Sequence, residues 1–431
     1  MILILKPNMD RKSREFKRLE SHIKGLPNIE MRVHRVQGAE QVLTEIHLIG
    51  HTSALSADEM KSFPGVDQVI RVSEVYRVLG RHKDDLRANY FTYQGVTFSQ
   101  DNLNVFAGLC AVDSPESVEK MMKALKENGQ VCTRMGAYKP RTNPYSFQGH
   151  GKICLPYVLE LAGKYGIKVI AMEVTHESHV VEIWEALEDA GNPTGVMLQI
   201  GTRNTQNFEL LKSVGKQQQF PVLLKRGFGI TLDESLHAAE YLASEGNQKI
   251  IFAFRGMKTN IGDPHRNMVD FAHIPVVKRL TRMPVCIDPS HSVGTRDRSS
   301  DGILDIMHVT AQGVIAGANM ILVDFHPDPG IALVDGPQAL RLEELPTFLK
   351  TFKSYETLTK NELLSHKRIK LNWSQKSFFS SIWSGMFVGS NRVLRIKPRR
   401  GDMSLLSELN HFFRSTSTNI AAPNGALSIN C

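Results

Sequence analysis

The sequence predicts an α/β protein built around a (β/α)8 TIM barrel. Eight short apolar segments rich in β-branched residues lie between residues 104 and 326, and helix-like stretches separate them. Eight strand–helix repeats over about 220 residues are typical of this barrel, whose active sites lie at the C-terminal strand ends. The predicted strands are Asn104–Cys110, Val131–Arg134, Lys168–Glu173, Gly195–Arg203, Pro221–Lys225, Lys249–Arg255, Pro284–His291 and Asn319–Asp324. The clearest predicted helices are Glu116–Asn128, Leu155–Tyr165, Leu232–Ser244 and Gly302–Ala316.

Residues 1–90 predict a separate ferredoxin-like α+β domain. Apolar alternation indicates strands at Met1–Leu5, Ile29–Val36, Leu43–Gly50 and Val66–Val78, with helices at Arg11–Lys24 and Ser56–Phe63. The order βαββαβ is that of the ferredoxin-like unit. A linker near Gly80–Ser99 then leads into the barrel, which we expect to occupy residues 91–350.

The composition is that of an ordinary globular protein. Hydrophobic residues make up 42% and charged residues 22% of the chain, and no apolar run reaches the ~20 residues needed to span a bilayer. The 5 cysteines form no C-x-x-C pair, which argues against a zinc knuckle or a disulfide framework. A reducing, cytoplasmic location is the simplest expectation.

The net charge of +8 comes from the C-terminal extension. Residues 351–431 contain 12 Lys and Arg but 4 Asp and Glu, so the first 350 residues are formally neutral. We therefore expect no membrane or nucleic acid partner for the barrel. The extension itself is basic and aromatic, and we interpret it as poorly ordered. A role in binding a membrane surface, nucleic acid or a protein stays open for it.

The predicted strands end on residues able to do chemistry. They deliver a thiol, a histidine, carboxylates, arginines and a lysine to one face of the barrel, a mixture that suggests a divalent metal beside an anion-binding pocket. The most specific segment runs from Arg134 to Gly149 and contains Lys139 and Arg141 between proline- and glycine-rich turns. Arginine offers a planar fork of donors that fits carboxylate or phosphate, and lysine adds a compact charge.

Together with five further segments, this loop resembles the 3-deoxy-D-arabino-heptulosonate-7-phosphate (DAHP) synthases of the short type I-beta form. The other segments are Phe106-Ala-Gly-Leu-Cys110-Ala-Val, Ile200-Gly-Thr-Arg203-Asn-Thr-Gln-Asn-Phe, Pro221-Val-Leu-Leu-Lys225-Arg-Gly, Ile287-Asp-Pro-Ser-His291 and Ala332-Leu-Val-Asp335-Gly-Pro-Gln. The resemblance covers residues 1–350. It implies metal-dependent condensation of phosphoenolpyruvate (PEP) with erythrose 4-phosphate, the first step of the shikimate pathway.

The resemblance also assigns substrate roles. Arg134 and Lys139 would hold the PEP carboxylate, and Lys139 could also move a proton. Arg203, Lys225 and Arg255 would surround the PEP phosphate and favour its departure. The pair Arg141–Thr142 matches the grip on the four-carbon sugar phosphate, which favours this family over the related octulosonate 8-phosphate synthases. Glu173 would accept a proton or orient water, although it could simply neutralise its cationic neighbours.

Four residues fall where the family has its metal ligands: Cys110, His291, Asp324 and Asp335. A thiolate, an imidazole and two carboxylates suit Mn, Fe, Co or Zn better than Mg or Ca. Cys110 alone would more often be a buried apolar residue, and only its partners favour a ligand. The family has Glu where this chain has Asp324, which retracts the carboxylate by about 1.5 Å, the length of one carbon–carbon bond. A strand shift, a bridging water or weaker metal binding would follow.

Several alternatives accompany this interpretation. A related PEP–aldose phosphate synthase of specialised metabolism, or a catalytically weakened homologue with a binding tail, would share many of the same residues. From the resemblance we also expect an aromatic amino acid effector at the N-terminal domain, and a homo-oligomer.

Overall fold

The computed structural model describes residues 1–37, 42–52, 55–71, 76–82, 90–261 and 264–360. The predicted C-terminal extension lies outside these ranges, apart from its first residues, which belong to a helix over positions 345–360. None of the helices in the described ranges is both long and apolar enough to cross a membrane.

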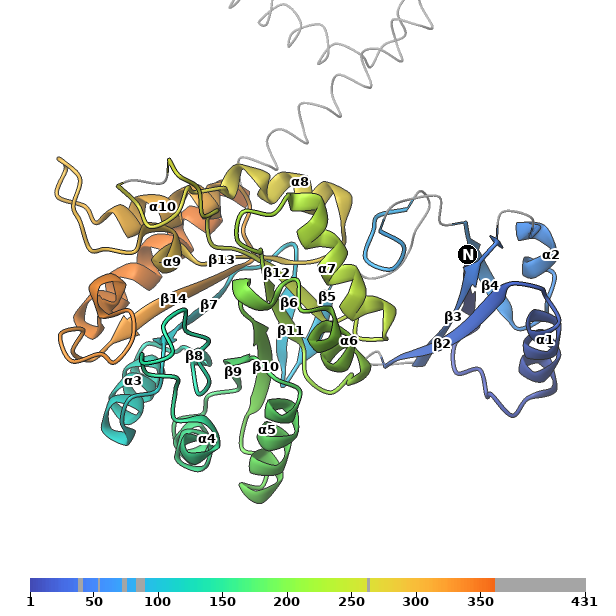
Figure 1. Ribbon diagram of the computed structural model, residues 1–431, viewed down its shortest axis with the longest axis horizontal. Coiled ribbons are helices and arrows are strands. Elements are labelled where there is room, and N and C mark those ends of the chain that lie inside the picture. The colour runs from blue at the N-terminus through green and yellow to red at the C-terminus, as the bar shows by residue number, and fades with distance from the viewer. Residues whose placement is uncertain (38–41, 53–54, 72–75, 83–89, 262–263, 361–431) are drawn as a thin grey trace, which may run out of the picture. The chain divides into compact units, whose positions relative to one another are not determined.

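The N-terminal residues form the predicted ferredoxin-like unit (Figure 1). Its elements are β1 (Ile2–Leu5), α1 (Arg14–Lys24), β2 (Ile29–Gln37), β3 (Val42–Gly50), α2 (Ala57–Lys61) and β4 (Val66–Ile70). The sheet has the order β2-β3-β1-β4, and each neighbouring pair is antiparallel. Helices α1 and α2 cover one face of it, where apolar side chains including Leu3, Phe16 and Met60 form a separate core.

One end of this unit differs from the prediction. The last strand stops at Ile70, and Val78 lies in a turn fixed to a barrel helix, because its backbone N–H donates to Glu240. The backbone groups there have side-chain partners, so alternation of apolar residues was not enough to indicate a strand.

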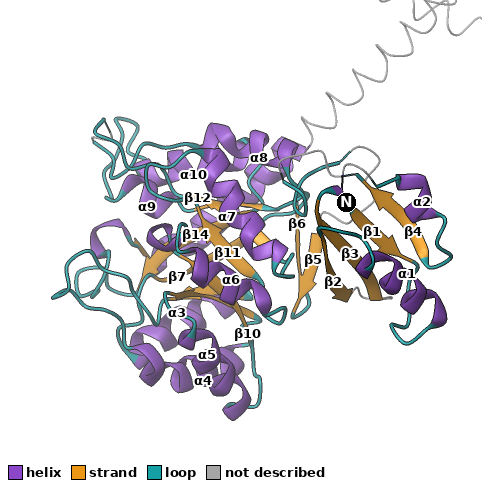
Figure 2. Ribbon diagram, turned by 45° about the vertical axis from the view of Figure 1, so that its right-hand side comes forward, coloured by secondary structure: helices purple, strands orange, loops and turns teal. Residues whose placement is uncertain are grey.

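The barrel is confirmed, with eight parallel strands closing on themselves among the described residues through the pairing of β13 with β14. Figure 2 shows the helices outside the ring of strands. The strands are β7 (Asn104–Leu109), β8 (Cys132–Met135), β9 (Val169–Val174), β10 (Gly195–Ile200), β11 (Val222–Lys225), β12 (Ile250–Phe254), β13 (Val285–Ile287) and β14 (Met320–His326). The helices are α3 (Pro115–Glu127), α4 (Leu155–Tyr165), α5 (Ser178–Asp189), α6 (Phe208–Lys216), α7 (Leu232–Ser244), α8 (Ile274–Leu280), α9 (Pro289–Val293) and α10 (Asp305–Ile315).

Local signals in the sequence explain where the helices begin. Ser114 accepts a hydrogen bond from the backbone of Ser117, and Pro115 takes the first helical position of α3. Helix α7 starts with a reciprocal capping box between Thr231 and Glu234. These caps set the lengths of the loops between strands and helices, and so fix where each strand-end side chain lies.

The segment predicted as a plain linker contains a β-hairpin, formed by β5 (Tyr90–Tyr93) and β6 (Val96–Ser99). Phe98 packs against Phe106 inside the barrel, and the Tyr93 hydroxyl accepts a hydrogen bond from the backbone of Val196 at the start of β10. The Gln100 side chain donates to the carbonyl of Met283, just before β13. The hairpin thus covers the N-terminal end of the barrel, opposite the predicted catalytic face.

Candidate active site at the strand ends

Four potential metal ligands meet at the C-terminal face of the barrel. One ligand atom each from Cys110, His291, Asp324 and Asp335 lies within 4.8 Å of the others. The Cys110 Sγ is 3.1 Å from Asp335 Oδ2 and 3.8 Å from His291 Nε2, and these last two atoms are 3.3 Å apart. Tetrahedral donors bonded at 2.0–2.3 Å lie about 3.3–3.8 Å apart. Three donors are therefore already at the spacing that a transition metal needs.

His291 reaches this group from a short helix, not from a strand. The prediction that the seventh strand runs to His291 is wrong, because β13 ends at Ile287 and Asp288 caps α9, which begins at Pro289. Asp288 Oδ1 accepts from the backbone N–H of His291 and lies 3.0 Å from its Nδ1. Such an outer carboxylate fixes the ring of a metal-binding histidine and leaves Nε2 for the metal.

In the absence of a metal, the electrostatics of His291 and Asp288 favour the charged form of both side chains. Burial disfavours an imidazolium, but the Asp288 and Asp324 carboxylates outweigh it and raise the pKa of His291 to about 10. Burial would also raise the pKa of Asp288, yet His291 and Lys225 hold it well below its usual range. Metal binding at Nε2 would therefore displace a proton from the ring.

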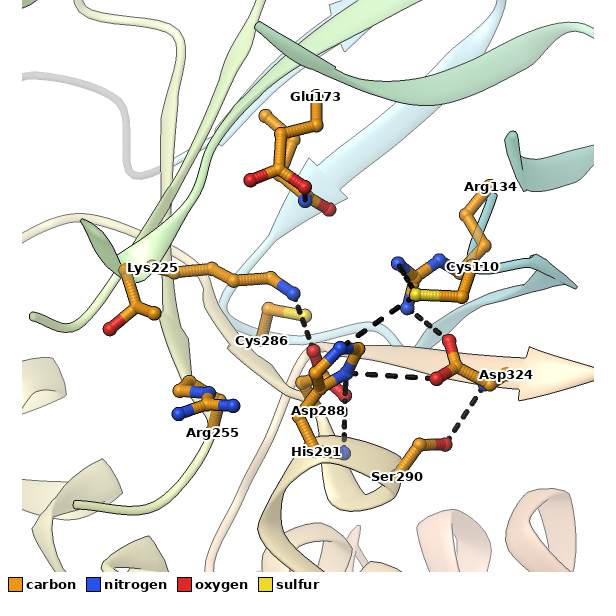
Figure 3. A network of polar contacts seen from close by, with 12 residues as sticks. Cys110, Arg134, Glu173, Lys225, Arg255, Cys286, Asp288, Ser290, His291 and Asp324 are labelled. Carbon is orange, nitrogen blue, oxygen red and sulfur yellow. Dashed lines mark hydrogen bonds and ion pairs between the residues drawn. The ribbon is translucent and has the colours of Figure 1, made fainter. Parts of the chain in front are cut away.

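Asp324 lies farthest from an ideal ligand position. Its side chain is buried, pairs with the Arg134 guanidinium (Figure 3), and accepts from Gln338 Nε2 at 2.5 Å. Its Oδ2 is 3.7 Å from His291 Nδ1. Strand β14 persists to His326, so His326 follows Asp324 on the same face, but its Nε2 faces Asp113 Oδ2 at 2.5 Å. His326 therefore has a carboxylate partner of its own.

Lys139 and Glu173 form the buried pair beside the thiol. Lys139 Nζ lies 3.4 Å from Cys110 Sγ and 3.3 Å from Glu173 Oε2, and Gln199 also donates to that oxygen. Burial opposes the ammonium, but Cys110 and Glu173 outweigh it and raise the pKa of Lys139. A Cβ at Gly201 would lie 2.0 Å from Glu173 Oε1, so only glycine leaves room for this carboxylate.

A cavity rich in positive charge opens next to the metal-ligand group. Its lining carries six cationic side chains and two carboxylates: Lys139, Arg141, Arg203, Lys225, Arg255, Arg266, Glu173 and Asp335. Thr142 lines it too and accepts from Arg203 Nη2 at 3.1 Å. Such a cavity attracts a small, multiply charged anion.

Arg134 lies behind this cavity and does not line it. Its guanidinium is buried between Asp324 and the Cys110 thiol, 3.5 Å from Sγ. Burial would lower the pKa of Arg134, but the Asp324 carboxylate outweighs this effect and raises it. A role in holding the PEP carboxylate stays a prediction, while its present partners are the candidate ligands.

Asp288 joins the cavity to the ligand group. Its Oδ2 accepts from Lys225 Nζ at 2.5 Å, while Oδ1 faces His291 (Figure 3). The adjacent Arg226 points elsewhere and pairs with Asp270, as expected for neighbours on a strand. One fully buried carboxylate therefore contacts both a lysine of the anion cavity and a candidate ligand.

Sequence reasoning assigned no role to Asp288, Gln199, Gln338 or Asp113. The position of Asp288 could have been predicted, because Asp-Pro is a helix-start signal. It places the aspartate as the cap of the helix that carries His291. The other three contact site residues on a neighbouring strand or the following loop, and no local pattern in the sequence marks them.

The comparisons with known proteins agree with this geometry. The profile of the DAHP synthetase I family matches residues 87–361, and that of the DAHP synthase ferredoxin-like domain matches residues 1–74. The phospho-2-dehydro-3-deoxyheptonate aldolase of Thermotoga maritima is 34% identical over 355 residues, which are 82% of this chain and 97% of that protein. The 2-dehydro-3-deoxyphosphooctonate aldolase of Rhodopseudomonas palustris is 27% identical and covers 60% of this chain.

A solved structure gives the same result. The crystal structure of the Thermotoga maritima DAHP synthase aligns with a TM-score of 0.59 at 31% identity, covering 83% of this chain and 97% of that one. Both the barrel and the ferredoxin-like domain therefore have counterparts in one known protein. The chain belongs to the DAHP synthetase I family.

Proposed function

We propose that the strand-end cluster is where this enzyme condenses PEP with erythrose 4-phosphate to give DAHP and phosphate. The observation that carries the proposal is the contact of two half-sites: a four-donor metal group and a cavity lined by six cations. Family membership supplies the reaction, and the cavity has the charge that two phosphorylated substrates require.

In this proposal each cation of the cavity has a defined substrate partner except Arg266, which pairs with Asp335. Lys225, Arg203 and Arg255 take the phosphate of PEP, and Lys139 takes its carboxylate with Arg134 behind it. Arg141 and Thr142, at the outer side of the loop after β8, take the phosphate of the sugar. Preorganised cations favour departure of phosphate, because they lie where negative charge builds up during the reaction.

Glu173 and Lys139 are the residues placed to move protons. Their side chains lie 3.3 Å apart in a buried site, so a proton can pass between them without bulk water. When bound, a divalent metal at Cys110, His291, Asp324 and Asp335 would act as a Lewis acid on the aldehyde of the sugar. The soft thiol favours Mn, Fe, Co or Zn over Mg.

The N-terminal domain fits the same proposal as a regulatory module for an aromatic amino acid. The match to the DAHP synthase ferredoxin-like domain supports this role. Deletion of residues 1–74 should leave the barrel active and abolish inhibition by every aromatic amino acid, and unchanged inhibition would contradict it. Assembly into a homo-oligomer stays a prediction.

The decisive experiment measures phosphate release from PEP with purified full-length protein. We expect release with erythrose 4-phosphate, loss of release with chelator, and recovery with added Mn²⁺. Arabinose 5-phosphate, an aldose phosphate one carbon longer than erythrose 4-phosphate, serves as the comparison substrate. Equal or faster release with arabinose 5-phosphate would overturn the substrate assignment, and no release with either sugar and any offered metal would overturn the function.

A further inference from the structure

The ring of Phe228 lies among three cations, two of which, Arg203 and Arg255, line the anion cavity. Phe228 follows β11, and its ring centroid is 5.3 Å from the Arg203 Cζ, 4.9 Å from the Arg255 Cζ and 6.0 Å from the Lys258 Nζ. These cations come from the loops after β10 and β12, the two strands that flank β11. Cations within about 6 Å of a ring centroid are attracted to an aromatic ring.

Arg203 and Arg255 have no acidic partner among the described residues, unlike three other arginines of this face. Within the described ranges, no carboxylate oxygen lies within 4.0 Å of either guanidinium. Arg134, Arg226 and Arg266 each pair with an aspartate. The hydrogen bonds of Arg203 and Arg255 go to neutral oxygens, those of Thr142 at 3.1 Å and Asn267 at 3.4 Å.

An aromatic ring can hold a guanidinium in place without neutralising it. A carboxylate partner would compete with the substrate phosphate for the same N–H donors, whereas the ring face uses none of them. The need for a holding group is clearest at Arg255. Burial lowers the pKa of Arg255 to about 10, and the neighbouring Arg266 and Arg203 charges act in the same direction. The free site therefore brings together cations that repel one another.

We propose that Phe228 is a positioning residue. Its ring holds the guanidinium groups of Arg203 and Arg255 in place while leaving their N–H donors free for the phosphate of PEP. The proposal rests on the proposed function for the identity of the ligand. It explains how Arg203 and Arg255 are held in place in the free protein without acidic partners. It also identifies a role for a residue that does not itself line the cavity.

The test separates ring electrostatics from ring shape. Phe228 is replaced in the full-length protein by mono-, di- and trifluorophenylalanine, which retain the ring and progressively weaken its attraction for cations. Binding of PEP is measured by titration calorimetry, without the second substrate. Phe228→Leu and Phe228→Tyr complete the series. Phe208→Leu is the matched control, because Phe208 lies on α6, is 42% exposed and packs at a tilt against the ring of Tyr241.

We expect PEP affinity to fall stepwise with each fluorine and about five- to thirtyfold in Phe228→Leu, the range for one or two such contacts. Phe228→Tyr should bind like the parent protein. In turnover assays KM for PEP should rise more than kcat falls, because the phosphate is held in both ground and transition states. Equal affinity across the fluorinated series would overturn the proposal, even if Phe228→Leu binds weakly through poor folding.

Failure of this proposal is distinguishable from failure of the proposed function. A parent protein that binds PEP but releases no phosphate with any sugar would contradict the function and leave the fluorine series informative. A flat series in an active enzyme would contradict only the role of Phe228.

Discussion

Replacing Asp324 by glutamate tests whether the shorter carboxylate limits metal binding at the strand ends. The other three donors lie 3.1–3.8 Å apart, whereas the whole group spans up to 4.8 Å, so the wider separations involve Asp324. The excess is about 1 Å, and one methylene extends a side chain by about 1.5 Å. Glutamate can therefore bring its oxygen to ligand distance without movement of β14.

The expected gain follows from how strongly ligand placement affects metal sites. Even the loss of a residue that only orients a ligand changes metal affinity by about 10–100-fold, or about 1.4–2.8 kcal/mol, and we expect an effect of at least this order for the ligand itself. Because Asp324 is buried against Arg134 and Gln338, the larger side chain should also lower stability by about 1–3 kcal/mol. We therefore expect tighter Mn²⁺ and Co²⁺ binding together with a lower Tm.

The assay is competition with a chromophoric chelator, supported by the thiolate-to-Co²⁺ absorption band. The matched control is Asp328→Glu, the same change at an exposed position in the following loop. If Asp324→Glu binds metal no better than the parent, and Asp324→Ala binds it equally well, then Asp324 is not a ligand. The reasoning from donor spacing would then be refuted.

Three further changes test other parts of the structure. Asp288→Asn should weaken Mn²⁺ binding about 10–100-fold, because the ring of His291 loses its charged partner. Gly201→Ala should reduce turnover with little change in metal affinity, because the new Cβ would displace Glu173. His34 should make stability depend on pH, since burial and the neighbouring imidazole of the same sheet lower its pKa to about 4. Its contribution to stability is complete above pH ~6.5 and falls towards pH 4. The shift corresponds to about 3 kcal/mol, which screening by solvent reduces.

The controls differ for each change. Asp297→Asn, on an exposed loop, should leave Mn²⁺ affinity unaltered, and an equal loss there would remove the argument from Asp288. Gly25→Ala is the glycine control, because Gly25 has an ordinary φ of −79° and a Cβ there would make only van der Waals contacts at 3.4 Å or more. For His34, chemical denaturation of the parent and of His34→Phe at pH 7 and pH 4.5 gives the comparison. Equal pH dependence in both proteins would show that another group is responsible.

The barrel was predictable because its signals are local and repeated. Each strand is a short apolar segment and each helix has its own caps, so errors were confined to the ends. The seventh strand illustrates the limit, because Cys286 and Ile287 are strand residues while Asp288 starts a helix within the same apolar-looking segment. The hairpin was missed although its arms flank a two-residue turn at Gln94–Gly95, because it lies outside the repeating strand–helix pattern of the barrel.

The candidate site was predictable to the level of which residues gather, but not of how they pair. Strand ends and family likeness indicated Cys110, His291 and Asp335 together, and their donor atoms do lie together. The preference of Arg134 for Asp324, and the contact of Asp288 with Lys225, depend on packing between strands far apart in the sequence. No pattern within one segment carries that information.

The β5–β6 hairpin closes one end of the barrel. Phe98 and its neighbours fill the end where the strands begin. Small molecules must therefore enter and leave at the opposite end, where the cationic cavity lies. In the proposed reaction, both substrates and both products would then use the same entrance. The molecule that binds deepest in the cavity must bind first and leave last. The closed end of the barrel therefore imposes an order on substrate binding and product release.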